Sequence, residues 1–178
     1  MASMQENPKE MMNSKLREFF IDQLQDIYWA EKKLVKTLPK LADASRSDKL
    51  RAAFQSHLIE TENHVSRAEQ AFALLGEEPK ATECPALKGI VEEGEDIIDE
   101  TDAGTAQRDV GLIFAGQKAE RYEIATYDSL VQLARDTGQN DIADLLEQTL
   151  EEEKKADEKL TSLAISGINR EAAQEMAR

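Results

Sequence analysis

Residues 110–134 read VGLIFAGQKAERYEIATYDSLVQLA, and this stretch decides the fold. Positions three and four apart form one stripe, which is the spacing of a single helix face. The stripe consists of Val110, Ile113, Gln117, Glu120, Ile124, Tyr127, Val131 and Ala134. Glu120 therefore occupies a core position in the middle of an amphipathic helix. Because a buried, unpartnered carboxylate is costly, this side chain must be protonated, paired or bound to a metal.

Acidic residues interrupt apolar stripes in two further segments. The stripe from Phe20 to Leu41 contains Glu31, and the stripe from Leu146 to Ala164 contains Glu153 and Asp157. A fourth stripe runs through residues 50–75 and carries the only two histidines of the chain. Amphipathic helices that direct ionisable groups at one shared interior are typical of metal-binding helical bundles.

The composition favours a helical protein of one domain. The chain has 178 residues, of which 40% are hydrophobic and 33% charged, with only 8 Gly and 4 Pro. Abundant Ala, Leu, Glu, Lys and Gln favour helices and leave little material for strands. The formal charge of −14 argues against nucleic-acid and membrane-surface partners and makes cations the natural ones.

The single cysteine, Cys84, excludes an intramolecular disulfide, and we expect it to be a buried structural residue. The N-terminal residues lack the apolar core of a secretory signal, which predicts a cytoplasmic location. No apolar run approaches the roughly 20 residues needed to span a bilayer.

Breaks in the pattern divide the chain into five helical segments, expected near residues 14–44, 48–75, 86–100, 105–136 and 140–166. Pro39 is expected to kink or divide the first of them near Thr37. Short turns make the first two and the last two long helices antiparallel pairs, and a long crossover with its own short helix joins the pairs. This predicts an all-α, ferritin-like four-helix bundle at 14–167, between a flexible tail at 1–13 and a C-terminal tail at 168–178.

The candidate ligands lie on all four long segments. Residues three or four apart on a helix share a face, so either His57 with Glu60 or Glu60 with His64 can hold one ion. The remaining candidates are Glu31, the pair Glu120 and Glu123, and the pair Glu153 and Asp157. Bridging carboxylates reduce the repulsion between two divalent ions, and a histidine suits iron or manganese.

Taken singly, each candidate has an ordinary explanation. A chain with 36 acidic residues places some Glu on any helix face, so a solvated edge or a salt bridge accounts for Glu123 alone. Each histidine alone is most simply a packing residue. The joint pattern, with acids on three stripes and histidines on the fourth, is what favours a metal site.

Four segments carry a resemblance to a known family. They are LQDIYWAEKKLVKTLPKLA (24–42), AAFQSHLIETENHVSRAEQAFALLGEEP (52–79), AGQKAERYEIATYDSL (115–130) and LLEQTLEEEKKADEKLTSLA (145–164). The chain resembles the YciE/YciF-type stress proteins, a bacterial ferritin-like family similar in fold to rubrerythrins, bacterioferritins and manganese catalases. The resemblance implies a homodimer with a dinuclear metal site.

By position, the resemblance implies ligands at Glu31, His57, Glu60, Glu120, Glu123, Glu153 and Asp157. It does not carry His64, where relatives have Gln. Glu153 and Asp157 also stand where the better-known di-iron proteins have a Glu-x-x-His pair, which weighs against catalase-like or ferroxidase turnover.

The expected function is therefore that of a stress protein that binds two iron or manganese ions and handles peroxide or oxygen. In that hypothesis Glu60 and Glu153 bridge the ions. Two alternatives stay open: a non-enzymatic protein that engages a partner through its acidic surface or the Leu87 to Ile98 helix, and a protein that sequesters metal without turnover. Crowded carboxylates at Glu31, Glu120, Glu153 and Asp157 are expected to have raised pKa values.

Overall fold

A computed structural model describes residues 14–175, and in that range the protein is helical without strands. The helices are α1 (Ser14–Ala44), α2 (Asp48–Leu75), α3 (Pro85–Glu100), α4 (Ala106–Asp136), α5 (Asn140–Leu163) and α6 (Asn169–Gln174), with a π-helical turn at Ala164–Ile168 between the last two. The prediction of an all-α protein is confirmed. The expected tail at 1–13 and the last three residues of the expected C-terminal tail lie outside the described range.

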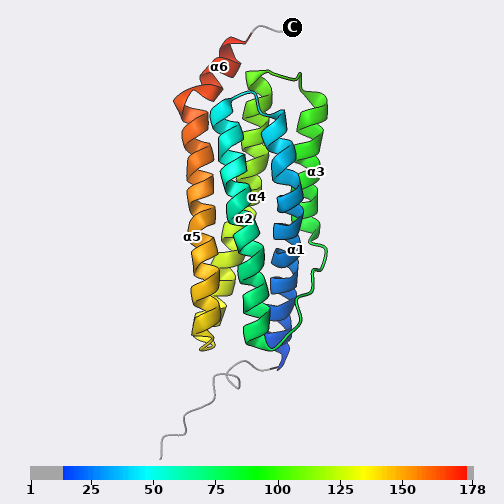
Figure 1. Ribbon diagram of the computed structural model, residues 1–178, viewed down its shortest axis with the longest axis vertical. Coiled ribbons are helices and arrows are strands. Elements are labelled where there is room, and N and C mark those ends of the chain that lie inside the picture. The colour runs from blue at the N-terminus through cyan, green and yellow to red at the C-terminus, as the bar shows by residue number, and fades with distance from the viewer. Residues whose placement is uncertain (1–13, 176–178) are drawn as a thin grey trace, which may run out of the picture.

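The four long helices α1, α2, α4 and α5 lie side by side along their whole length, and α3 runs along the outside (Figure 1). Their facing sides form an apolar core, which includes Phe20, Leu24, Ile27, Leu50, Phe54, Phe72, Leu112, Ile113, Leu130, Ile142, Leu146 and Leu160. Apolar burial of this extent is the main stabilising contribution to a helical protein. The core holds the middle turns of all four long helices against one another.

Capping residues fix where α2 begins and ends and where α4 begins. Ser47 Oγ accepts a hydrogen bond from the Leu50 amide at the start of α2, and Thr105 Oγ1 accepts one from the Arg108 amide at the start of α4. Gly76 ends α2 with φ of 74°, a left-handed conformation that glycine adopts without strain. These are the boundaries that the sequence pattern predicts.

A buried carboxylate connects the α1–α2 turn to α4. Asp109, on the first turn of α4, accepts hydrogen bonds from the backbone amides of Arg46 and Ser47 at 2.7 and 2.8 Å. Because the two amides lie in the turn before α2, this contact sets the height of α2 relative to α4. It thereby aligns the two helices that carry most of the polar interior.

The structure describes both positions at which the sequence predicts a helix interruption, Pro39 and Gly167. α1 is not divided at Pro39 but continues to Ala44. The proline is exposed and lies close to the helix end, where a missing backbone hydrogen bond disturbs few others. At the same end of the bundle, α5 ends at Leu163, before Gly167 as the sequence predicts; the chain bends at Gly167, where φ is 175°, and continues as the short helix α6 (Figure 1).

The extra helix α3 covers the core rather than presenting an apolar face to solvent. Leu87 and Val91 are buried, and Ile90, Ile97 and Ile98 are partly buried against the core. Among the described residues, no helix combines the length and the apolar character that a membrane crossing requires.

Candidate metal centre

Ionisable side chains from four helices converge halfway along the interior. α1 contributes Glu31, α2 His57 and His64, α4 Glu120 and Glu123, and α5 Glu153. All six are buried, and the relative exposure of each residue is at most 6%. We call these six residues the central cluster.

The two histidines project from the same side of α2. They are seven residues apart, which corresponds to two helical turns, and their ring centroids are 6.0 Å apart with planes inclined by 66°. Thr61, between them, is also buried, and its hydroxyl donates to the His57 carbonyl at 2.8 Å, so it does not compete for the ring nitrogens. The spacing leaves one histidine for each half of the cluster.

One half of the cluster is built around His64. Its Nδ1 lies 2.9 Å from Glu153 Oε1 and 3.4 Å from Glu31 Oε2. The ligand atoms of these three residues lie within 4.8 Å of one another, close enough for one metal ion to contact all three. We call this the His64 half.

The other half is built around His57. Its Nε2 lies 3.4 Å from Glu120 Oε1 and 3.4 Å from Glu153 Oε2. These three residues form a second group within the same 4.8 Å limit. Glu153 therefore belongs to both groups and offers one oxygen to each histidine, which is the arrangement of a bridging carboxylate. We call this the His57 half.

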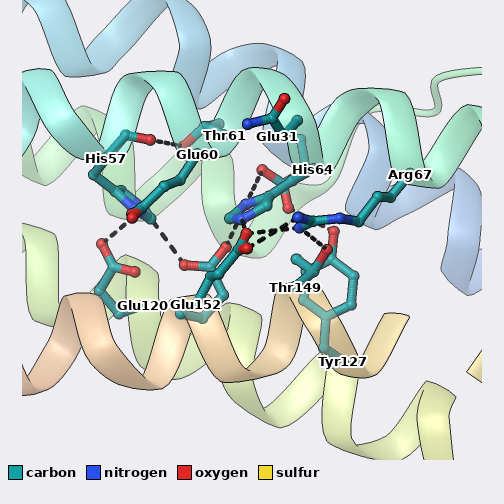
Figure 2. A network of polar contacts seen from close by, with 12 residues as sticks. Glu31, His57, Glu60, Thr61, His64, Arg67, Glu120, Tyr127, Thr149 and Glu152 are labelled. Atoms are coloured by element: carbon teal, nitrogen blue, oxygen red, sulfur yellow. Dashed lines mark hydrogen bonds and ion pairs between the residues drawn. The ribbon is translucent and has the colours of Figure 1, made fainter. Parts of the chain in front are cut away.

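Each histidine has a carboxylate behind it. His57 Nδ1 lies 3.1 Å from Glu60 Oε2, and His64 Nε2 lies 2.9 Å from Glu152 Oε2 (Figure 2). A carboxylate at one ring nitrogen favours a proton there and leaves the other nitrogen free to accept or to bind a metal. In both rings, the nitrogen that faces the cluster is thus the one available to a metal ion.

The carboxylate behind His64 is itself held in place. Arg67 Nη1 and Nη2 donate to both oxygens of Glu152 at 2.6 and 2.9 Å, and Nη1 also lies 3.2 Å from Thr149 Oγ1. This bidentate pair crosses from α2 to α5 and closes the seam between them at that level (Figure 2). Within residues 14–175, Glu60 has no such support, and its side chain is 42% exposed.

A tyrosine fixes the α1 carboxylate. Tyr127 Oη donates to Glu31 Oε1 at 2.5 Å, and both side chains are buried. Burial and the charge of Glu31 raise the pKa of Tyr127 well above its usual value, so the phenol keeps its proton and remains a donor. The second oxygen of Glu31 is the one that faces His64.

The cluster contains polar atoms that have no hydrogen-bond partner. Among the described residues, eight buried side-chain atoms are in this state: Glu31 Oε2, His57 Nε2, His64 Nδ1, Glu120 Oε2, and both oxygens of Glu123 and Glu153. All belong to the central cluster. Buried polar groups are nearly always satisfied, so such a concentration requires an explanation. A set of oxygen and imidazole donors directed at a common interior fits iron or manganese.

The protonation preferences of the side chains reflect the crowding. Burial, followed by the charge of Glu153, raises the pKa of Glu120 and that of Glu123 well above the usual value. Burial likewise raises the pKa of Glu31, despite the nearby His64. These directions agree with the sequence-based expectation for Glu31 and Glu120.

Glu153 differs from the other acids. Burial opposes its ionisation, but its contact with His64 and the positive charge of His57 outweigh that effect and lower its pKa. Burial also disfavours a charged His64, yet the charge of Glu31 and the contact with Glu153 raise the pKa of His64 to about 10. The expectation of a raised pKa is therefore wrong for Glu153, because it lies between two histidines.

The three remaining predicted ligands, Glu60, Asp157 and Glu123, belong to neither group of three and differ in their positions. Glu60 contacts His57 from the outside and is not between the two halves, where the sequence hypothesis places a bridge. Asp157 lies one turn above Glu153 and is half-buried, beside the amide of Gln117 at 3.3 Å and the guanidinium of Arg121 at 3.4 Å. Glu123 is fully buried in the cluster but belongs to neither group of three.

The family resemblance does not extend to His64, and no sequence pattern singles out Glu152. His64 is fully buried and faces two cluster carboxylates, and Glu152 is its outer partner. One signal for His64 was available: it lies on the same stripe as His57, one heptad further along. No comparable signal distinguishes Glu152 from Glu151.

Comparisons with known proteins agree with this fold. The chain is 43% identical to protein YciF from Escherichia coli strain K12 over 163 residues, which are 90% of this chain and 98% of that protein. The crystal structure of that stress protein superimposes with a TM-score of 0.82 at 42% identity and covers 86% of this chain and 97% of its own. The structure of YcfI from Rhodopseudomonas palustris gives 0.79 at 31% identity, with 91% and 98% covered.

A structure from Xanthomonas campestris shares 23% identity with a TM-score of 0.68 over 89% of this chain and 99% of its own, which shows similarity of fold. The family model described as Domain of unknown function (DUF892) matches residues 15–173. The chain therefore belongs to this family, whose members include the stress protein YciF.

Proposed function

We propose that the protein is a ferritin-like four-helix bundle whose central cluster binds two divalent metal ions, iron or manganese. The observation that carries the proposal is the set of eight buried atoms without a hydrogen-bond partner, all of which lie in that cluster. A charge argument supports it as well. When ionised, the carboxylates of Glu31, Glu120, Glu123 and Glu153 match the charge of two divalent ions, and such matching makes buried charges tolerable.

The proposed ligand set differs from the sequence hypothesis in three positions, because it adds His64 and leaves out Glu60 and Asp157. Glu31, His64 and Glu153 would hold one ion, and His57, Glu120 and Glu153 would hold the other, with Glu123 as a further donor from α4. Glu60 holds the His57 ring, and Asp157 holds Gln117.

A pair of iron or manganese ions would supply electron transfer to peroxide or oxygen, and we propose this as the activity in stress. The side chains support it by orientation. Tyr127 holds one oxygen of Glu31, and Glu152 keeps the proton on His64 Nε2, so the metal-facing atoms need no rearrangement. Glu60, partly exposed beside His57 Nδ1, is placed to carry protons between that half and solvent.

The similarity to YciF supports a role for this protein in stress. YciF is named a stress protein, and the present chain covers nearly all of it. We propose the same setting for this chain, as a cytoplasmic homodimer. Sedimentation of the purified protein tests the dimer: a single species of monomer mass would contradict it.

Metal analysis tests the central proposal. Protein purified without added metal, then titrated with Mn(II), is expected to hold about two ions per chain, by analogy with other dinuclear bundles. Anomalous scattering from crystals is expected to place both ions between Glu153 and the two histidines. Protein that takes up no metal would contradict the proposal, whereas metal uptake without peroxide-dependent turnover would support sequestration.

A non-enzymatic role is the second candidate, because the relative YcfI is described as a proposed structural protein. The apolar residues of α3 do not favour it, since they pack on the core. The acidic surface remains as the partner-binding element of that alternative.

A further inference from the structure

A cavity of about 470 Å³ lies in the seam between α2 and α5 and reaches the His57 half of the central cluster. Its volume is within the range of about 300–1,000 Å³ that is usual for small-molecule sites. The seam is closed at the level of Arg67 and Glu152, so the cavity occupies the part towards the start of α2 and the end of α5.

The inner end of the cavity is polar. His57 and Glu120 line it, and both are more than nine-tenths buried with an atom that has no hydrogen-bond partner. Glu60 lines it too, with its carboxylate against His57. Two acids at this end oppose the entry of a negative group in the absence of metal.

The middle of the cavity is apolar. Phe54, Leu160 and Leu163 line it, together with small residues, Ala53 and Ala156 among them. Phe54 and Leu160 pack on Gly116 of α4, where an added Cβ would lie 2.8 Å from Leu160 Cδ1. Because Gly116 has no side chain, Phe54 and Leu160 can pack close to α4, deep between α2 and α5.

The opening is positively charged. Lys49, Lys155 and Lys159 line the cavity and are exposed, so they lie at its mouth. Across residues 14–175, none of the three ammonium groups forms an ion pair, although lysines elsewhere pair with acids. In a chain of formal charge −14, a mouth with three lysines free of ion pairs is complementary to an anion.

We propose that this cavity binds an amphiphilic organic anion, with its charged head at the three lysines and its apolar body along Phe54, Leu160 and Leu163 towards His57. A medium-chain carboxylate has this chemistry. The cavity adjoins the centre of the proposed function, but its wall and mouth do not depend on a metal. The test therefore uses metal-free protein, and its failure is distinct from a failure to bind metal.

Calorimetric titration of metal-free protein with decanoate measures the binding. Decyltrimethylammonium is the matched probe of opposite charge. Decanoate is expected to bind and decyltrimethylammonium to bind at least about tenfold more weakly, because of the lysines. Amide shifts in NMR spectra at Ala52 and Ala156 are expected to move with decanoate. Equal binding of both probes, or no shift at these positions, would overturn the proposal.

Two variants locate the site. The triple variant Lys49→Glu, Lys155→Glu, Lys159→Glu is expected to weaken decanoate binding at least about tenfold, whereas Lys36→Glu, on exposed α1 surface, leaves it unchanged. Ala156→Phe fills the cavity and is expected to abolish binding, with Ala73→Phe on the exposed side of α2 as its control.

Other outcomes contradict the proposal in specific ways. Binding that appears only after loading with Mn(II) would place the head at the cluster rather than at the mouth. Absence of binding, combined with a change of sedimenting mass in Ala156→Phe, would assign the seam to contact between two copies. If Ala156→Phe does not fold, as judged by circular dichroism, the lysine variant and the NMR shifts still decide.

Discussion

The two halves of the central cluster share a carboxylate but differ in their access to solvent. Behind His64, the Glu152–Arg67 pair and Thr149 close the seam, and the ring is fully buried. Behind His57, Glu60 is partly exposed and a cavity of about 470 Å³ reaches the ring. One half is enclosed by a charged cross-link, whereas the other opens towards solvent.

The two halves have similar sets of candidate ligands, so their different access to solvent predicts different roles for them. Each set has one histidine, one carboxylate of its own and the shared Glu153. The enclosed half has an outer partner held by two hydrogen bonds, which fixes the ring and is expected to slow the exchange of a bound metal ion. We expect the open half to be where exchange and chemistry occur.

The largest effect is expected from removing what the halves share. Glu153→Gln leaves the shape of α5 unchanged but takes one anionic oxygen from each half, so both metal ions are expected to be lost, with affinity reduced by about 100-fold or more. Metal content after dialysis checks this. Glu151→Gln, on the exposed side of α5, is the control and is expected to retain full content; equal loss in both variants would contradict a specific bridge.

Replacing one histidine at a time separates the halves. His57→Ala and His64→Ala are each expected to weaken one of the two Mn(II) sites by at least about tenfold and leave the other. Calorimetric titration resolves the stoichiometry, which is expected to fall to one tight ion in each variant. A His64→Ala protein that binds like the parent would show that the enclosed half is a structural ion pair.

Much of the fold follows from the sequence because its determinants are local. The acids that interrupt each stripe are found from helix periodicity alone, so Glu31, Glu120 and Glu153 are identifiable as interior residues. The caps at Ser47, Thr105 and Gly76 likewise depend on neighbouring residues. Local patterns of this kind can be recognised from the sequence alone.

The division of roles within the site is not local. Which nitrogen of His57 faces the cluster depends on the rotamer that packing selects, and Glu60 becomes its outer partner only once α2 faces α5. Asp157 is on the same face as Glu153, but the edge of the seam provides Arg121 and Gln117 as partners. Such assignments require the relative positions of three helices.

Removing the Glu152 charge that closes the His64 half is expected to have a moderate effect on metal binding. Glu152→Gln removes the charge that orients His64 and pairs with Arg67, so affinity at the His64 half is expected to fall by about tenfold and dissociation to accelerate. Release of Mn(II) to a chelator, followed by stopped flow, measures the rate. Glu60→Gln is the matched change in the open half; a smaller acceleration relative to the parent there than in Glu152→Gln would fit the comparison, and the reverse order would contradict it.

The smallest effect concerns pH and the stability of the metal-free protein. Burial raises the pKa values of Glu120 and Glu123 above 4.5, and the pKa of His64 rises from 6.5 to about 10, so the folded state binds more protons than the unfolded state. Their contribution to stability is complete below the unfolded pKa values and is lost as pH rises through the folded ones. Glu153 has a lowered pKa, so its contribution to stability has the opposite pH dependence: it is present above the unfolded pKa and is lost as the pH falls.

Metal-free protein is therefore expected to lose stability between pH 5 and 8, by roughly 3–6 °C in melting temperature per pH unit for each extra proton. Mn(II) is expected to reverse this trend, because ligands bind in the deprotonated form and protons compete with the ion. Melting curves with and without Mn(II) measure both slopes. The double variant Glu120→Gln, Glu123→Gln is expected to flatten the metal-free slope, since a neutral amide cannot titrate; an unchanged slope would assign the pH dependence to other groups.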